Sequence, residues 1–212
     1  MRPETVLAFD TSAAHCAAAL LLPDGNCLIM QEEMAKGQAE RLLPLVQDLL
    51  AKAGLGWPDL AAIGVGTGPG NFTGVRISVA TARGLSLALG IPAIGVTVFD
   101  ALAQGLPRPL AVAQDARRDE VYLQLFNATD HPAQLLTVDQ ARQAIGALPT
   151  VGSATEMLNK INPLHPAMPL VQAIAQVAQA RLGTTHPRPA PFYLRSADAA
   201  PPSDLPPVIL DA

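Results

Sequence analysis

The feature that most constrains the fold is the opening of the chain, where three strand-like apolar runs precede any helix. These runs cover residues 5–10, 16–22 and 27–33, and only the short turns 10-DTSAAH-15 and 23-PDG-25 separate them. Asp-Gly between two such runs is a strong hairpin signal. The pattern therefore predicts a three-stranded antiparallel meander and excludes a dinucleotide-binding fold that alternates strand and helix from the start.

Helices and strands alternate after this meander. Leucine and valine recur at helical spacing over residues 38–53, and Gly54 stands in the C-cap position. Pro44 lies inside this pattern, where it would kink or interrupt a helix. The next expected elements are a strand at 61–66, a helix at 73–90, a strand at 93–98 and a short helix at 99–105. The order β-β-β-α-β-α-β is typical of a ribonuclease-H-like lobe.

After Pro107 the sequence begins a shortened version of the same plan. The expected elements are strands near 110–115, 121–127, 134–138 and 150–154, and helices at 139–148 and 169–183. We therefore predict an α/β protein with two ribonuclease-H-like lobes, the second one reduced. The predicted divisions are an N-terminal lobe at 1–105, a C-terminal lobe at 106–190 and a proline-rich tail at 191–212. Residues 192-FYLR-195 are expected to dock on the body, and the residues after them to be mobile.

Composition limits the classes of function. The formal net charge is −4, and the sequence has no cluster of Lys and Arg of the kind that grips nucleic acid unaided. Cys16 and Cys27 are expected to stay reduced, because the hairpin register places them far apart along the ladder. The sequence begins with no basic, apolar leader, and no apolar run approaches the ~20 residues of a membrane span. A cytoplasmic protein without membrane contact is expected.

The stretch 66-GTGPGNFTGVR-76 most resembles a ligand-binding loop. It fails the Walker A pattern because valine follows the second glycine, and it fails the dinucleotide pattern on spacing. Two interpretations stay open. The glycines permit tight packing beside a neighbouring strand, or the helix N-terminus, capped by Asn71 or Thr73, contacts an anion. The candidate anion contacts are Gly68, Gly70, Thr73 and Arg76, and Arg76 is expected to pair with a carboxylate or an anion.

A second candidate is the turn Asp10-Thr11-Ser12 at the end of the first strand. Actin-like proteins and sugar kinases hold a nucleotide-bound metal with an acidic turn at this place, although their turn carries a glycine that this one lacks. The four histidines show no metal-ligand spacing, so no metal site is expected. No Gly-x-Ser-x-Gly elbow is present, so the sequence gives no support for nucleophilic catalysis.

The helix at 73–90 carries small residues in two stripes with four-residue spacing. One stripe is Gly74, Ser78 and Ala82, and the other is Ala80, Gly84 and Ala88. Small residues in a row let another backbone approach closely. Either stripe could pack on the lobe's own sheet or form a subunit interface. The candidate partner interface combines Gly74, Ser78, Ala80, Gly84 and Ala88 with Leu42, Leu45, Val46 and Leu49 of the preceding helix.

The run 66–103 resembles the bacterial TsaB family, also called YeaZ. The pattern Gly-Pro-Gly-Asn-Phe-Thr-Gly-Val-Arg-Ile is specific to that family when it follows an Asp-Thr-Ser turn. Further matches are 6-VLAFDTS-12, 40-ERLLPLVQDLL-50, 115-DARRDEVY-122 and 193-YLR-195. Together these segments span nearly the whole chain in the expected order. Gln38 stands where many relatives carry His.

The resemblance implies two lobes of the actin-like ATPase superfamily and a role in making threonylcarbamoyladenosine beside the anticodon of tRNAs that read ANN codons. It implies a non-catalytic scaffold that activates the catalytic subunit TsaD, with the ATPase TsaE completing the assembly. It also implies a homodimer when TsaD is absent, and contact with tRNA only through the complex. No cofactor is expected on this chain alone, and ATP or ADP is a candidate at the interface with TsaD. The alternative is an actin-fold ATP-dependent phosphotransferase that uses Asp10 and the glycine loop.

Overall fold

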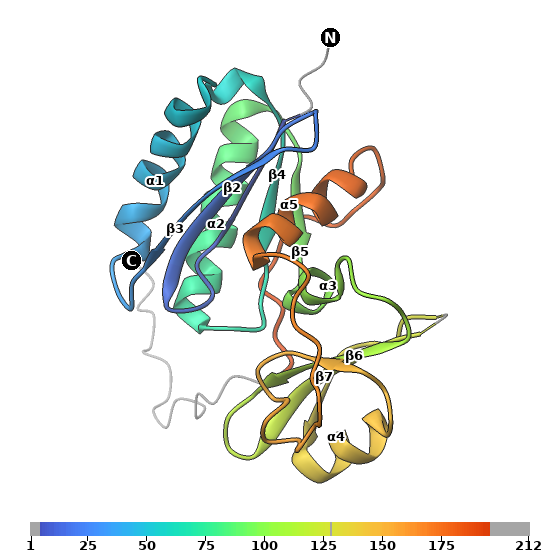
Figure 1. Cartoon of the computed structure of the whole chain (residues 1–212). Helices are drawn as coiled ribbons and strands as arrows, with labels where there is room; N and C mark the ends of the chain where they lie inside the picture. The colour runs from blue at the N-terminus through green and yellow to red at the C-terminus, as the bar shows by residue number, and fades with distance from the viewer. Residues whose placement is uncertain (1–4, 128, 196–212) are drawn as a thin grey trace, which may run out of the picture.

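A computed structural model describes residues 5–127 and 129–195, which form two lobes (Figure 1). The first contains β1 (Thr5–Asp10), β2 (His15–Leu21), β3 (Cys27–Glu33), α1 (Gln38–Ala53), the 3-10 turn η1 (Trp57–Asp59), β4 (Leu60–Gly66), α2 (Phe72–Leu89), β5 (Ala93–Val96) and α3 (Val98–Ala103). Then follow β6 (Leu110–Asp115), β7 (Glu120–Phe126), β8 (Gln134–Thr137), α4 (Val138–Ile145), β9 (Thr150–Val151) and α5 (Leu170–Ala180).

The first sheet has the strand order β3-β2-β1-β4-β5. The first three strands are antiparallel neighbours, as the short turns require, and β4 and β5 join them in parallel through helical crossovers. Leu21 pairs with Cys27 and Cys16 pairs with Glu32, so the two cysteines are far apart on the ladder and both are free. The predicted meander is confirmed.

The helices of the first lobe begin and end close to their expected positions. Gly54 closes α1 in the left-handed conformation that its missing side chain permits. Pro44 stands in the second turn of α1, and the helix runs through it without a break. Asn71, rather than Thr73, is the N-cap of α2, and its side chain accepts a hydrogen bond from the Gly74 amide at 2.9 Å.

Helices cover both faces of the first sheet. α1 and α2 pack on one face, with leucine and valine side chains from both helices in the same buried cluster. α5 packs on the opposite face, against strands β1, β2 and β4 (Figure 1). Assigning residues 170–180 to the C-terminal lobe was therefore wrong. The alanines of α5 meet small residues of the sheet, among them Ala8, Ala17 and Ala62, which need a cover of their own.

The second sheet repeats the order of the first four strands, as β8-β7-β6-β9. α4 covers one face, with Ala141 and Ile145 in the buried cluster. The other face packs against Phe99 and Ala103 of α3, which comes from the first lobe. The strand order of both sheets confirms the predicted pair of ribonuclease-H-like lobes, the second one reduced. Among the described residues, no helix is both long and apolar enough to span a membrane.

Candidate functional site

The glycine loop between β4 and α2 is packed against the turn that follows β1. A Cβ atom built on Gly70 would lie 2.6 Å from the carbonyl oxygen of Ser12, and one built on Gly74 would collide with that of Thr11. The Asn71 amide donates to the Ser12 carbonyl at 2.6 Å, and Thr11 Oγ1 donates to the Gly74 carbonyl at 2.7 Å. The glycines therefore permit a close approach of two backbone segments, as the structural interpretation of this loop predicts.

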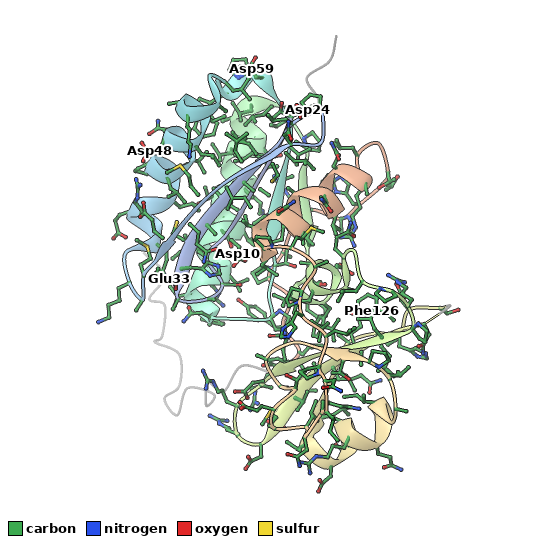
Figure 2. All side chains as sticks on the ribbon, in the orientation of Figure 1. Asp10, Asp24, Glu33, Asp48, Asp59 and Phe126 are labelled. Carbon is green, nitrogen blue, oxygen red and sulfur yellow. The ribbon has the colours of Figure 1, made fainter. Side chains whose placement is uncertain are left out.

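Asp10 holds this turn in shape from inside the lobe. Its Oδ2 atom accepts hydrogen bonds from the Ser12 amide at 3.0 Å and from Ser12 Oγ at 2.9 Å, and it lies 2.9 Å from Nε2 of His15. The carboxylate is fully buried, whereas Asp24, Asp48 and Asp59 lie at the periphery (Figure 2). The hydrogen bond to Asp10 is the main cause that raises the pKa of His15, and burial opposes it.

Burial contradicts a direct nucleotide contact for part of the predicted anion site. Asp10 and Thr11 have no exposed surface, and Gly68 is buried with φ +87°. Asp10 Oδ1 is directed toward Gly66, where an added Cβ would collide with it, and has no hydrogen-bond partner among the described residues. The carboxylate therefore faces the sheet rather than a ligand. Of the other predicted contacts, Gly70 and Thr73 are exposed, whereas Ser12 is buried, with 5% of its surface exposed.

A polar cleft lies between the lobes beside this turn. It has a volume of about 620 Å³, and its walls include Ser12, Gln38, Asn71, Asp115, Arg117 and Tyr122. Gln38 donates to the carbonyl oxygen of Met34 at 3.2 Å and contacts that of Ala13 at 3.5 Å. Gln38 therefore ties α1 to the loops around the cleft. Among the described residues, no group of three or more His, Cys, Asp or Glu is placed to hold a metal ion.

Arg76 lies in an aromatic contact instead of an ion pair. Its guanidinium carbon lies 3.7 Å from the centre of the Phe72 ring, and its Nε donates to the Tyr193 hydroxyl at 2.9 Å. The Phe72 and Tyr193 rings stack at 5.5 Å. Pairing of Arg76 with a carboxylate was therefore wrong within the described chain, because an aromatic face and a phenol take its place. The contact also docks residue 193 on the body, as the sequence predicts.

The two small-residue stripes of α2 have different surroundings. Gly74, Ser78 and Ala82 are buried, and Ser78 Oγ lies 3.3 Å from the Gly66 carbonyl. These three residues face the interior of their own lobe, where Gly74 contacts the turn after β1, so Gly74 and Ser78 were wrongly placed in a partner interface. The second stripe faces outward. Ala80, Gly84 and Ala88 are exposed, and a Cβ added to Gly84 would have no neighbour within 4 Å.

The leucine face of α1 is also internal. Its apolar stripe forms the core beneath the helix, and the four residues proposed for the interface have no exposed surface: Leu42, Leu45, Val46 and Leu49. They were wrongly assigned to a partner, because the apolar face of an amphipathic helix first covers its own sheet. The outward residues are Leu43, with 43% exposure, together with Pro44, Gln47 and Ala51.

We define the α2 outer face as Phe72, Arg76, Ala80, Arg83, Gly84, Leu87 and Ala88, all exposed. Leu87 has 78% of its surface exposed and Phe72 has 52%, which is unusual for side chains of their size. The sequence pattern could identify the small stripe but not these large residues, because their exposure depends on how α2 is rotated on the sheet. Apolar surface of this kind on one helix is typical of a protein–protein contact.

Comparison with known proteins agrees with this geometry. The family model for TsaD, tRNA N6-adenosine threonylcarbamoyltransferase, matches residues 29–189. The tRNA threonylcarbamoyladenosine biosynthesis protein TsaB of Escherichia coli is 40% identical over 122 residues, which are 55% of this chain and 52% of that protein. TsaB of Bacillus subtilis is 34% identical over 142 residues, 64% of this chain and 61% of that protein.

The chain thus spans between about a third and about a half of the length of the first curated relatives it matches. Likeness to a solved structure extends further. The structure of YeaZ from Pseudomonas aeruginosa superposes with a TM-score of 0.72 at 32% identity, covering 90% of this chain and 99% of that one. Because a family model matches most of the chain and a solved relative is covered almost completely, we conclude that this chain belongs to the TsaB (YeaZ) family.

Proposed function

We propose that this protein is a non-catalytic scaffold subunit in the biosynthesis of threonylcarbamoyladenosine in tRNA. It binds TsaD through the α2 outer face and the adjacent outward residues of α1, and so holds the catalytic subunit in its active form. The observation that carries the proposal is the exposed stripe Ala80, Gly84 and Ala88 beside Leu87, which has no cover within the described chain. The names of the relatives supply the pathway.

The small residues Ala80, Gly84 and Ala88 on this face allow another helix to pack closely against it. Gly84 and its neighbours at four-residue spacing let a partner helix approach to the short end of the usual 8–10 Å range. Leu43 of α1 and Leu87 of α2 add larger apolar groups. We infer that the same face forms a homodimer when TsaD is absent, and that TsaE and tRNA join only the assembled complex.

The experiment replaces Ala80 with Trp, which fills the outer stripe without entering the core. We expect the affinity for TsaD to fall at least about tenfold, a loss of about 1.4 kcal/mol. Threonylcarbamoyladenosine, measured by nucleoside mass spectrometry of cellular tRNA, falls with it. The matched control is Ala144→Trp, on the exposed side of α4 in the other lobe. If both variants bind TsaD and support the modification equally, the interface is elsewhere.

The phosphotransferase alternative is less well supported by the geometry. Asp10 is fully buried and is hydrogen-bonded to Ser12, so it does not present a carboxylate to the interlobe cleft. The chain alone is proposed to bind no cofactor, and ATP or ADP is proposed to bind only at the interface with TsaD. Calorimetric titration of nucleotide into the isolated protein and into the complex separates these ideas. ATP turnover by the isolated protein that is lost in Asp10→Asn would favour the alternative.

A further inference from the structure

The α2 outer face continues into a groove that the C-terminal segment of the chain already borders. This groove has a volume of about 420 Å³ and is lined by Arg76, Val79, Ala80, Arg83 and Pro191. Two residues after Pro191, the Tyr193 ring stacks on Phe72. Tyr193 therefore contacts the start of the α2 outer face, and the described chain ends two residues later at Arg195, which is hydrogen-bonded to Ala116 and Glu120 of the second lobe.

The charges on α2 are of one sign. Arg76 and Arg83 are the only ionisable residues in the helix sequence. Arg76 is engaged with Phe72 and Tyr193, whereas Arg83 makes no hydrogen bond or ion pair with the residues that the structure describes. An exposed apolar stripe with an available cation suits an occupant that combines apolar side chains with carboxylates.

The sequence beyond the described residues has this composition. Residues 196–212 contain Asp198, Asp204 and Asp211 and no Lys, Arg or His, and the apolar run 208-VIL-210 lies between the last two of these aspartates. Arg195 is the last described residue. The 13 residues from 196 to 208 can reach about 40 Å when extended as proline-rich chains are. The stretch of α2 from Phe72 to Leu87 is about 22 Å long.

We propose that residues 204–212 bind the α2 outer face of the same molecule. Val208, Ile209 and Leu210 cover Ala80, Gly84 and Leu87, and the flanking aspartates pair with Arg83. The segment is an internal competitor for the surface, which lowers self-association and makes binding of a partner depend on displacing it. The competition rests on the proposed function of this face, but the intramolecular contact does not.

The intramolecular arrangement makes even weak binding sufficient. A short flexible connection gives an effective concentration in the millimolar range, so a segment whose dissociation constant is about 1 mM would occupy the face for a large fraction of the time. A second protein molecule at micromolar concentration must compete with that occupancy. The apparent affinity of that second molecule for the face should fall by a factor of two to several, and its binding is not abolished.

The first test compares amide spectra of the full-length chain with those of the variant Val208→Asp, Ile209→Asp. We expect the ¹H–¹⁵N resonances of Ala80, Gly84 and Leu87 to shift. The control variant Ala199→Asp, Ala200→Asp adds the same charge to the connecting part and should leave them in place. Unchanged α2 resonances in the first variant would refute the contact. Shifts that depend on protein concentration would refute it too, because they assign the face to a second copy.

A second test uses the charges. Arg83→Glu should give the same α2 resonance changes as the tail variant, and Asp204→Arg with Asp211→Arg should restore the original pattern in that background. Arg117→Glu, in an exposed turn of the other lobe, is the matched control. Failure of the reversed charges to restore the pattern contradicts the proposed pairing. If the spectra behave as expected and TsaD still does not bind, the scaffold function fails while the tail contact stands.

Discussion

At the scale of single residues, two glycines of α2 have opposite surroundings although they lie in the same helix. Gly74 touches the backbone of the β1–β2 turn so closely that an added methyl group would collide with the Thr11 carbonyl. Gly84, nearly three turns later, has open space where its side chain would be. Both are helical, so the helix propensity of the two sites is comparable and the tertiary contact alone distinguishes them.

This contrast gives a stability prediction. Gly74→Ala should destabilise the protein by about 1–3 kcal/mol, because the turn must move away from α2. Gly84→Ala should stabilise it by about 0.5–1 kcal/mol, because alanine restricts the unfolded chain and favours the helix. Urea unfolding followed by circular dichroism measures both. Equal effects of the two substitutions would contradict the close packing of the loop against the turn.

His15 gives a prediction about pH. Its pKa is raised from 6.5 in the folded protein, chiefly by the hydrogen bond to Asp10, with the charge of Asp10 and then that of Glu33 adding to the effect. A raised pKa in the folded state means that the protonated ring stabilises the fold at pH values below 6.5, and that this stabilisation is lost as pH rises through the raised pKa. The free energy difference between the wild type and His15→Gln should therefore shrink from pH 6 to pH 8.

Urea unfolding at each pH measures this difference. His186→Gln is the control for replacing a histidine by glutamine, because the His186 ring lies 3.5 Å from the Pro187 carbonyl and forms no ion pair with the residues that the structure describes. A difference for His15→Gln that is constant from pH 6 to pH 8 would show that its interaction with Asp10 does not depend on protonation.

At the scale of elements, the sequence correctly predicted those features that depend on residues close together in the chain. The meander, the Gly54 cap and the Asn71 cap follow from turn and capping residues within a few positions. The location of α5 does not, because amphipathic spacing shows that a helix has an apolar face but not which sheet it covers. Its alanines fit the small residues of the first sheet, a match between segments more than a hundred residues apart.

The candidate interface was only partly predictable for the same reason. Both α2 stripes consist of small residues, so composition could not tell which one faces the sheet. The distinction arises from contacts at a distance in sequence. The β1–β2 turn packs on Gly74, Ser78 Oγ lies 3.3 Å from the Gly66 carbonyl, and Ala80 and Gly84 are left at the surface. The leucines of α1 were predicted to belong to the partner interface. Their complete burial assigns them to the core.

At the scale of the whole molecule, residues 192–195 connect the lobes. The Phe192 amide donates to the Thr67 carbonyl of the first lobe at 2.8 Å, and its ring packs edge-on against Phe99. Arg195 then reaches the second lobe, where Nη2 donates to the Ala116 carbonyl at 2.9 Å and to Glu120 at 2.6 Å. Because Tyr193 lies between them on Phe72, this strap links the α2 outer face to the turn that borders the interlobe cleft.

Because the strap contacts both lobes, we expect a change in the second lobe to alter amide exchange in α2. Arg195→Ala removes the contacts with Ala116 and Glu120, so amide exchange should quicken in residues 115–120 and at the first turn of α2, measured by hydrogen exchange with mass spectrometry. The loss in global stability should be small, because both partners are partly exposed to solvent, which weakens an ion pair. Arg117→Ala removes an exposed pair with Asp115 in the same turn and is the control. If the strap couples the two lobes, exchange must quicken at both of the regions that it contacts. Faster exchange at residues 115–120 without any change at α2 would therefore mean that the two lobes move independently.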